Sequence, residues 1–133
     1  NGRFATLGWQ PLLLFTNAIP FDELIAWYRC ADVCWITPLR DGLNLVAKEY
    51  VACHPHNTGA LVLSEFAGAA RELRRAYMVN PYDLNGMKDT VIQALNDPPA
   101  EKRRRMASLK RQVRENTVDR WAENFLGTLD SLG

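Results

Sequence analysis

Apolar residues along this chain follow two patterns, which predict two kinds of secondary structure. Runs that are almost wholly apolar lie between turn-forming residues at 12–15, 33–36, 60–64 and 77–80. Short runs of this kind are typical of strands that are covered on both faces. Elsewhere, as at Met87, Val91, Ile92 and Leu95, apolar residues recur at the three- and four-residue intervals of a helix with one buried face.

Helices are expected at about 22–31, 43–53, 69–75 and 83–96, and two more follow Pro98. Asp22 and Glu23 fall in the first turn of the first helix, where acids interact favourably with the helix dipole. Thr117 is a candidate N-cap of the last helix. Because strands alternate with helices of about ten residues, the pattern predicts an α/β fold, with a parallel sheet flanked by helices.

Right-handed crossovers bring the carboxyl ends of parallel strands to one edge of the sheet, and open α/β sheets bind their ligands there. The loops at this edge are expected at 16–20, 37–42, 64–68 and 80–83. The polar and glycine residues expected to line it are Asn17, Asp41, Gly42, Glu65, Gly68, Asn80 and Asp83.

The segment 37–50 is the strongest candidate for a ligand site, because a strand, a tight loop and a helix start follow one another. Backbone N–H groups at a helix start are free to hold an anion, and Gly42 permits a close approach of the backbone. Asp41 lies in the loop and Glu49 along the helix, which predicts a phosphate site between two carboxylates. The competing interpretations are a simple strand–helix turn and a surface ion pair between Lys48 and Glu49.

Composition and charge restrict the possible functions. With 133 residues, 47% of them apolar and 23% charged, the chain is expected to form one soluble globular domain. It has no apolar run long enough to span a membrane, and its net charge of +1 gives no general attraction to lipid or nucleic acid. Cys30, Cys34 and Cys53 are an odd set without paired spacing, which predicts free thiols and a cytoplasmic location. The absence of an initiating methionine suggests a chain cut from a longer one.

Several other motifs favour unspecialised interpretations. His54 and His56 are expected to be loop residues, because no set of side chains around them has the spacing of metal ligands. The basic run 102–105 is expected to be a solvated helix face, since no aromatic residues are interleaved with it, so no nucleic-acid partner is expected. The segment 65–70 fits equally a second helix start facing an anion or small residues that allow close packing.

Residues 31–33 and 37–52 resemble the trehalose-6-phosphate synthase family of retaining glycosyltransferases. Segments 61–70 and 79–83 fit the same family, and the resemblance runs through nearly the whole chain. In finer detail, residues 1–4, 19–21 and 35–37 look most similar to the glucosylglycerol-phosphate synthase branch.

The resemblance implies a GT-B architecture, in which two Rossmann-like domains enclose the active site. Residues 1–97 would form the Rossmann-like nucleotide-sugar-binding domain, incomplete at its N-terminus. Residues 98–133 would be the C-terminal helices of the same domain, packing back towards the interdomain cleft. The unpaired sheet edge left by the missing strands would favour self-association into a homo-oligomer.

The resemblance also assigns roles to particular residues. Asp41 is the catalytic candidate and would hydrogen-bond hydroxyls of the transferred glucose. Glu49 would take the ribose hydroxyls, and the backbone at Ile19 would read the edge of the base. Backbone N–H groups would bind the sugar and then the diphosphate along the run Gly42, Leu43, Asn44, Leu45 and Val46.

The implied reaction moves glucose from ADP- or UDP-glucose to a phosphorylated acceptor, without a metal or other cofactor. The first expectation is glycerol 3-phosphate as acceptor, giving glucosylglycerol phosphate for compatible-solute synthesis. The alternative is glucose 6-phosphate, giving trehalose 6-phosphate. A second alternative is a non-catalytic regulatory or interaction module of the same fold. Because the family's phosphate-binding Arg and Lys and its acceptor residues lie outside this chain, the chain alone is expected to be inactive.

Overall fold

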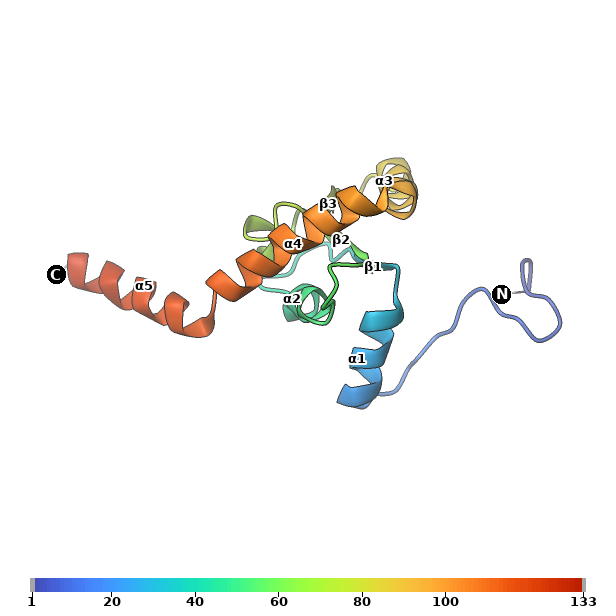
Figure 1. Ribbon diagram of the computed structural model, residues 1–133, viewed down its shortest axis with the longest axis horizontal. Helices are drawn as coiled ribbons and strands as arrows, with labels where there is room; N and C mark the ends of the chain where they lie inside the picture. The colour runs from blue at the N-terminus through green and yellow to red at the C-terminus, as the bar shows by residue number, and fades with distance from the viewer. Residues whose placement is uncertain (1, 133) are drawn as a thin grey trace.

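The computed structural model describes residues 2–132 and confirms the predicted α/β class, with a parallel sheet flanked by helices (Figure 1). In chain order the elements are α1 (Phe21–Cys30), β1 (Val33–Ile36), α2 (Leu45–Ala52), β2 (Ala60–Ser64), the 3-10 turn η1 (Gly68–Arg71), β3 (Tyr77–Val79), α3 (Leu84–Asn96), α4 (Pro99–Glu115) and α5 (Val118–Leu132).

The sheet has the order β1-β2-β3, and both pairs of strands are parallel. Val33 pairs with Ala60, and Val62 pairs with Tyr77, so the three carboxyl ends lie at one edge as predicted. All five residues of β2 are buried, because strands flank it on both sides and helices cover both faces. The strands predicted at 33–36 and 60–64 are confirmed.

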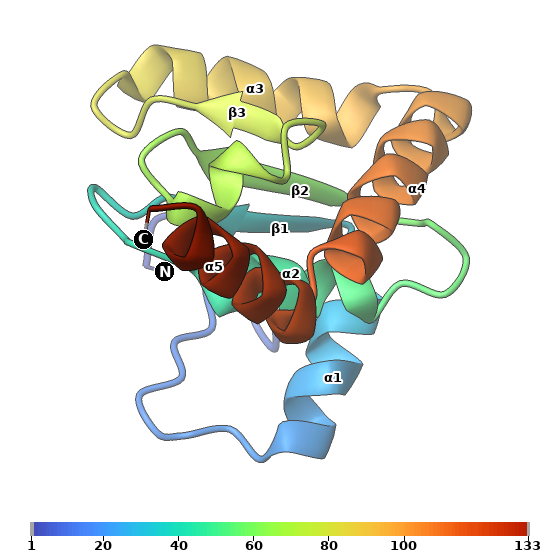
Figure 2. The same ribbon diagram turned by 90° about the vertical axis from the view of Figure 1, so that its left-hand side faces the viewer.

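Alternate residues of β2 serve two hydrophobic cores on opposite faces of the sheet. Leu61 and Leu63 face α2, η1 and α4, whereas Ala60 and Val62 face α3. Figure 2 shows α3 and α4 running along different sides of the sheet. Complete burial of a leucine contributes about 1.5–3 kcal/mol, so the two leucines alone anchor β2 strongly.

The strand predicted at 12–15 is wrong. These four residues belong to no sheet of the described structure, and their side chains are exposed. An apolar run becomes a strand only when a neighbouring strand satisfies its backbone, and the segment before α1 runs away from the sheet instead (Figure 1). β1 is an edge strand of the described sheet, and the expected self-association there stays a prediction.

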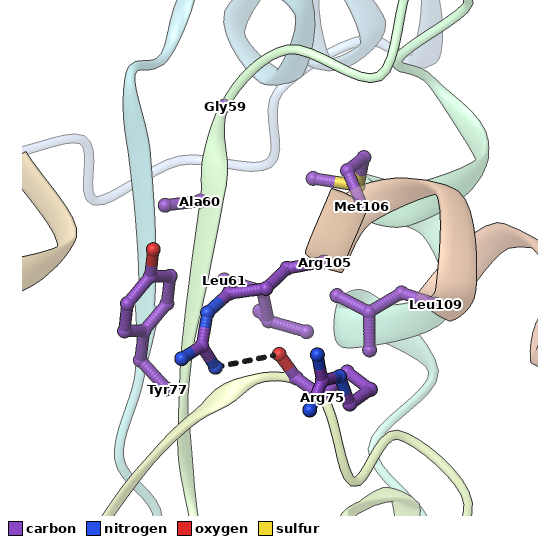
Figure 3. Close-up of a pocket in the computed structure, with 8 residues that line it drawn as sticks. All are labelled: Gly59, Ala60, Leu61, Arg75, Tyr77, Arg105, Met106 and Leu109. Atoms are coloured by element: carbon purple, nitrogen blue, oxygen red, sulfur yellow. Dashed lines mark hydrogen bonds between the residues drawn. The ribbon is translucent and has the colours of Figure 1, made fainter. Parts of the chain in front are cut away.

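The basic run 102–105 was expected to be a solvated helix face; Arg103 and Arg104 are exposed, but Arg105 is an exception. Its guanidinium lies 4.4 Å from the centroid of the Tyr77 ring and forms a 2.9 Å ion pair with Glu101. Figure 3 shows the same side chain donating from Nη1 to the backbone oxygen of Arg75, at 3.3 Å. Arg105 therefore fastens α4 to β3 and to the segment before it.

His54 is a loop residue, as expected, but it is also buried. Its side chain is 2% exposed, and its ring lies 4.4 Å from that of Tyr50, measured between centroids. Lys110 of α4 donates to the His54 backbone oxygen at 2.9 Å, which ties the end of α2 to α4. Burial lowers the pKa of His54, and the charge of Lys110 acts in the same direction.

The last helix extends away from the sheet (Figure 1). Thr117 caps it as predicted, its Oγ1 accepting from the backbone N–H of Arg120 at 3.3 Å. α4 packs on α2 and β2, whereas the apolar residues of α5 are exposed: Val118, Trp121, Phe125, Leu126 and Leu129. Packing of 98–133 towards an interdomain cleft stays a prediction, because it concerns a second domain.

Candidate functional site

The loop after β1 and the loop after β2 are joined by three backbone hydrogen bonds. Asp41 donates to the Phe66 oxygen at 3.3 Å, Gly68 donates to the Asp41 oxygen at 2.8 Å, and Ala69 donates to the Leu43 oxygen at 2.8 Å. A Cβ at Gly68 would lie 2.5 Å from the carbonyl carbon of Gly42 and would meet its oxygen as well. Of the two interpretations of segment 65–70, the structure therefore favours small residues that allow close packing.

The carboxylate of Asp41 is held by two donors from the helix start. Oδ1 accepts from the Leu43 backbone N–H at 3.0 Å, and Oδ2 accepts from the Asn44 side-chain amide at 2.9 Å. Both bonds lower the pKa of Asp41, and the bond from the Leu43 N–H has the larger effect. Asp41 is therefore anionic at neutral pH. The N–H of Leu43, expected to meet a sugar, is already used by Asp41 in this structure.

Asn44 is the N-cap of α2 and has a left-handed backbone, with φ 65° and ψ 81°. A residue other than glycine loses roughly 1–2 kcal/mol in this conformation, although asparagine tolerates it better than most. Two hydrogen bonds offset the loss: Oδ1 accepts from the Ala47 N–H at 3.0 Å, and the amide donates to Asp41. As first residues of the helix, Leu45 and Val46 have N–H groups without intrahelical acceptors.

Glu49 lies further along α2, and its partner is a tyrosine of α1 rather than the adjacent Lys48. Its Oε2 accepts from the hydroxyl of Tyr28 at 3.2 Å. Burial and the Glu49 carboxylate raise the pKa of Tyr28 to about 12, so its hydroxyl stays a donor at neutral pH. The ion pair considered between Lys48 and Glu49 does not form, because Lys48 pairs with Glu72 at 2.7 Å.

The structure does not bring Ile19 to the other candidates. It precedes Pro20, the N-cap of α1, and the helix carries the chain about 13 Å further before Tyr28 meets Glu49. No recorded contact joins Ile19 to Asp41 or Glu49 in the described structure, and its role towards a base stays a prediction. Asn17 likewise lies in a segment that follows no strand.

Some residues of the site went unrecognised in the sequence. Tyr28 is one of these residues, because nothing in its position in the sequence indicates the bond to Glu49. Phe66 and Tyr82 were also unremarked, yet their rings lie 6.0 Å apart beside the loop that holds Asp41. Aromatic side chains on neighbouring loops at a ligand-binding edge are a signal that could have been used.

The described residues also bear on metal binding, on the state of the cysteines and on the membrane. Among residues 2–132, no three His, Cys, Asp or Glu side chains gather so that they could hold a metal ion. The three cysteines are free, as predicted, and burial raises the pKa of Cys34 to about 11. No helix in this part of the chain has the length and apolarity needed to cross a membrane.

The arrangement suits an anionic ligand that also carries hydroxyl groups. The N-terminus of α2 presents free N–H groups and a partial positive charge. The Asp41 carboxylate beside it can accept hydrogen bonds from hydroxyls, and so can Glu49 along the helix. The predicted pair of carboxylates around a helix start is therefore present, and what each carboxylate binds stays a prediction.

Comparison with known proteins gives a consistent result. Glycosyltransferase family 20 matches residues 1–131. The trehalose-6-phosphate synthase of Mycobacterium leprae is 58% identical over 129 residues, covering 97% of this chain and 26% of that protein. The synthase of Mycobacterium avium is 56% identical over 133 residues, covering all of this chain and 27% of that protein. The chain thus spans about a quarter of the length of these relatives.

Solved structures agree with the fold. The trehalose-phosphate synthase from Burkholderia xenovorans, in complex with glucose-6-phosphate, superposes with a TM-score of 0.90 and 49% identity, covering 98% of this chain and 29% of that one. The E. coli protein bound with UDP-2-fluoro glucose gives a TM-score of 0.90 at 44% identity, covering 97% and 29%. These neighbours are GT-B proteins, which confirms the predicted fold class for this chain, while the two-domain arrangement stays a prediction because the chain covers only 29% of each structure. The resemblance to the glucosylglycerol branch is not supported, because the relatives are named trehalose-6-phosphate synthases. The chain belongs to glycosyltransferase family 20.

Proposed function

We propose that this chain is the donor-binding part of a retaining glucosyltransferase that makes trehalose 6-phosphate from a nucleotide-glucose and glucose 6-phosphate. The names of its relatives support this acceptor over glycerol 3-phosphate. The Burkholderia neighbour is described as UDP-forming and the E. coli neighbour as bound with UDP-2-fluoro glucose, which favours UDP-glucose as donor. Another neighbour is described in terms of glycosyltransfer with retention.

The observation that carries the proposal is the placement of Asp41 against the start of α2. Its carboxylate is ionised and oriented by donors from Leu43 and Asn44. It can accept hydrogen bonds from the hydroxyls of a glucose, while the N–H groups of Leu45 and Val46 meet the diphosphate. When the bond between glucose and diphosphate breaks, negative charge grows on the diphosphate. Dipoles that are already oriented stabilise that charge without reorganisation.

The test is a product assay with the full-length enzyme that carries this chain. UDP-glucose and ADP-glucose are each offered with glucose 6-phosphate or glycerol 3-phosphate. We expect product with glucose 6-phosphate, and a higher kcat/KM with UDP-glucose. Product with glycerol 3-phosphate alone would overturn the proposed acceptor, and binding of the donor without transfer to either acceptor would indicate the non-catalytic alternative.

Asp41→Asn tests the proposed catalytic role. The amide nitrogen cannot accept hydrogen bonds, so we expect kcat to fall by a factor of about 10²–10³, the usual loss for one transition-state contact. Asp89→Asn is the matched control, since Asp89 is exposed on α3 and lies outside the candidate site. Equal activity of the two variants would contradict the assignment of Asp41.

The chain by itself is expected to transfer no glucose. The acceptor and the remaining donor contacts would come from the part of the enzyme outside these residues. Incubation of the purified 133-residue chain with both substrates tests this, and detectable trehalose 6-phosphate would refute it.

A further inference from the structure

The partner of Glu49 comes from a different helix and is well fixed. Tyr28 lies near the end of α1, and its hydroxyl donates to Glu49 Oε2 at 3.2 Å. Its ring packs edge-on against Tyr50, with 6.2 Å between the centroids and 85° between the planes. Tyr50 is completely buried and donates its own hydroxyl to the Ala31 oxygen at 3.2 Å. The position of the Tyr28 hydroxyl is thereby fixed relative to α2.

Glu49 depends on such a partner for its orientation. Its side chain has three rotatable bonds and would otherwise sample several rotamers. The ion pairs recorded for residues 2–132 involve Lys48, Arg104 and Arg105, and none includes Glu49. Tyr28 is the recorded hydrogen-bond partner of its carboxylate in the described structure. This single bond therefore restricts the direction in which the carboxylate points.

We propose that Tyr28 is a positioning residue that orients Glu49 towards the two hydroxyls of the donor's ribose. The inference rests on the proposed function, because it takes the ligand of this helix to be a nucleotide-sugar. A carboxylate has about four acceptor sites on its two oxygens, so one bond from Tyr28 leaves Oε1 and part of Oε2 free. A vicinal diol can fill the remaining sites with two parallel hydrogen bonds. Orientation by Tyr28 then acts on binding of the donor, while the chemical step depends on Asp41.

Tyr28→Phe in the full-length enzyme is the test, since phenylalanine keeps the ring against Tyr50 and removes only the hydroxyl. We expect the KM for UDP-glucose to rise about 3- to 10-fold, the effect of one lost hydrogen bond, with kcat within about twofold. With the 2′-deoxyribose analogue of UDP-glucose, Glu49 has one hydroxyl fewer to bind, so the KM should change by less than about twofold. Tyr50→Phe is the control, because it removes the bond to Ala31 without touching Glu49. It should lower the melting temperature and leave the preference for ribose over deoxyribose intact.

Glu49→Gln distinguishes a failure of the Tyr28 inference from a failure of the proposed function. If Glu49→Gln reduces the preference for ribose and Tyr28→Phe does not, the positioning role is overturned and the donor site stands. If Tyr28→Phe raises the KM equally for both donors, the tyrosine acts through packing and the inference is again overturned. If Glu49→Gln leaves the KM of both donors unchanged, the ribose contact of the proposed function fails, and the inference fails with it.

Discussion

Gly68 joins the loop after β2 to the loop after β1, and its replacement by alanine should damage both the fold and the site. The new Cβ would lie 2.5 Å from the carbonyl carbon of Gly42 and 3.0 Å from the Leu43 nitrogen, whereas ordinary contact begins at 3.4 Å. All of these neighbours are backbone atoms, which cannot rotate away. The two loops must therefore part by about 1 Å.

A separation of that size breaks the bonds that hold the Asp41 loop in place. Gly68 to Asp41 and Ala69 to Leu43 are both 2.8 Å, and Asp41 to Phe66 is 3.3 Å, so each would exceed 3.5 Å. Three hydrogen bonds at about 0.5–1.5 kcal/mol each give a loss of about 2–4 kcal/mol in the free energy of unfolding. Because the same loop carries Asp41, the KM for the donor should rise as well.

Thermal melting and donor KM of the full-length enzyme measure the two effects. Gly127→Ala is the control, because a Cβ there meets nothing within 4 Å and alanine favours the helix over glycine by about 1 kcal/mol. We expect Gly68→Ala to melt several degrees lower and Gly127→Ala to melt no lower than the parent. Parent-like melting and donor KM in Gly68→Ala would refute the argument that this glycine is required for the close approach of the loops.

Three further predictions concern stability. Asn44→Ala removes the cap of α2 at φ 65° and should lower the free energy of unfolding by about 2 kcal/mol, whereas Asn44→Gly, which accepts that φ, should lose less; urea denaturation compares them. Burial lowers the pKa of His54 below its ordinary 6.5. The contribution of the neutral imidazole to the free energy of unfolding is therefore complete above pH 6.5. It is lost as the pH falls further, at up to about 1.4 kcal/mol per pH unit. Denaturation from pH 7.5 to 5 should show a slope that His54→Gln removes, and an unchanged slope would contradict this. Arg105→Lys loses the planar contact with Tyr77 and should cost about 0.5–2 kcal/mol, while the exposed Arg104→Lys should cost less than 0.5; equal losses would argue against the ring contact.

The sequence was sufficient to locate most of the regular structure. Strands 33–36 and 60–64 were placed correctly because each is an apolar run between turn residues, and burial on both faces requires that composition. The helices at 84–96 and 99–115 followed from their periodicity and from Pro98 and Pro99. The helix start after Gly42 was visible for the same reason, since a proline, an aspartate and a glycine lie between strand and helix. These signals come from residues close together in the sequence, so the sequence alone is enough to predict the elements.

What failed were the inferences that depend on a neighbour distant in sequence. The apolar run 12–15 reads as a strand, but pairing is a property of two segments, and this one belongs to no sheet of the described chain. His54 was correctly predicted to lie in a loop, but its burial was not predicted, because the residues that contact it, Tyr50 and Lys110 of α4, cannot be identified from the loop sequence. Lys48 has an acid at its side in sequence, but it pairs with Glu72, which is 24 residues away.

The candidate site, too, was predictable from the sequence only in part. The residue types in segment 41–49 were enough to indicate a helix start with two carboxylates, because capping and N–H exposure act over only a few positions. Only the folded chain shows that Asp41 is oriented by Leu43 and Asn44, that Gly68 fixes its loop, and that Glu49 has a tyrosine from another helix beside it. Contacts between segments depend on how helices and strands pack in space, and packing is decided by the whole set of side chains rather than by any stretch of the sequence.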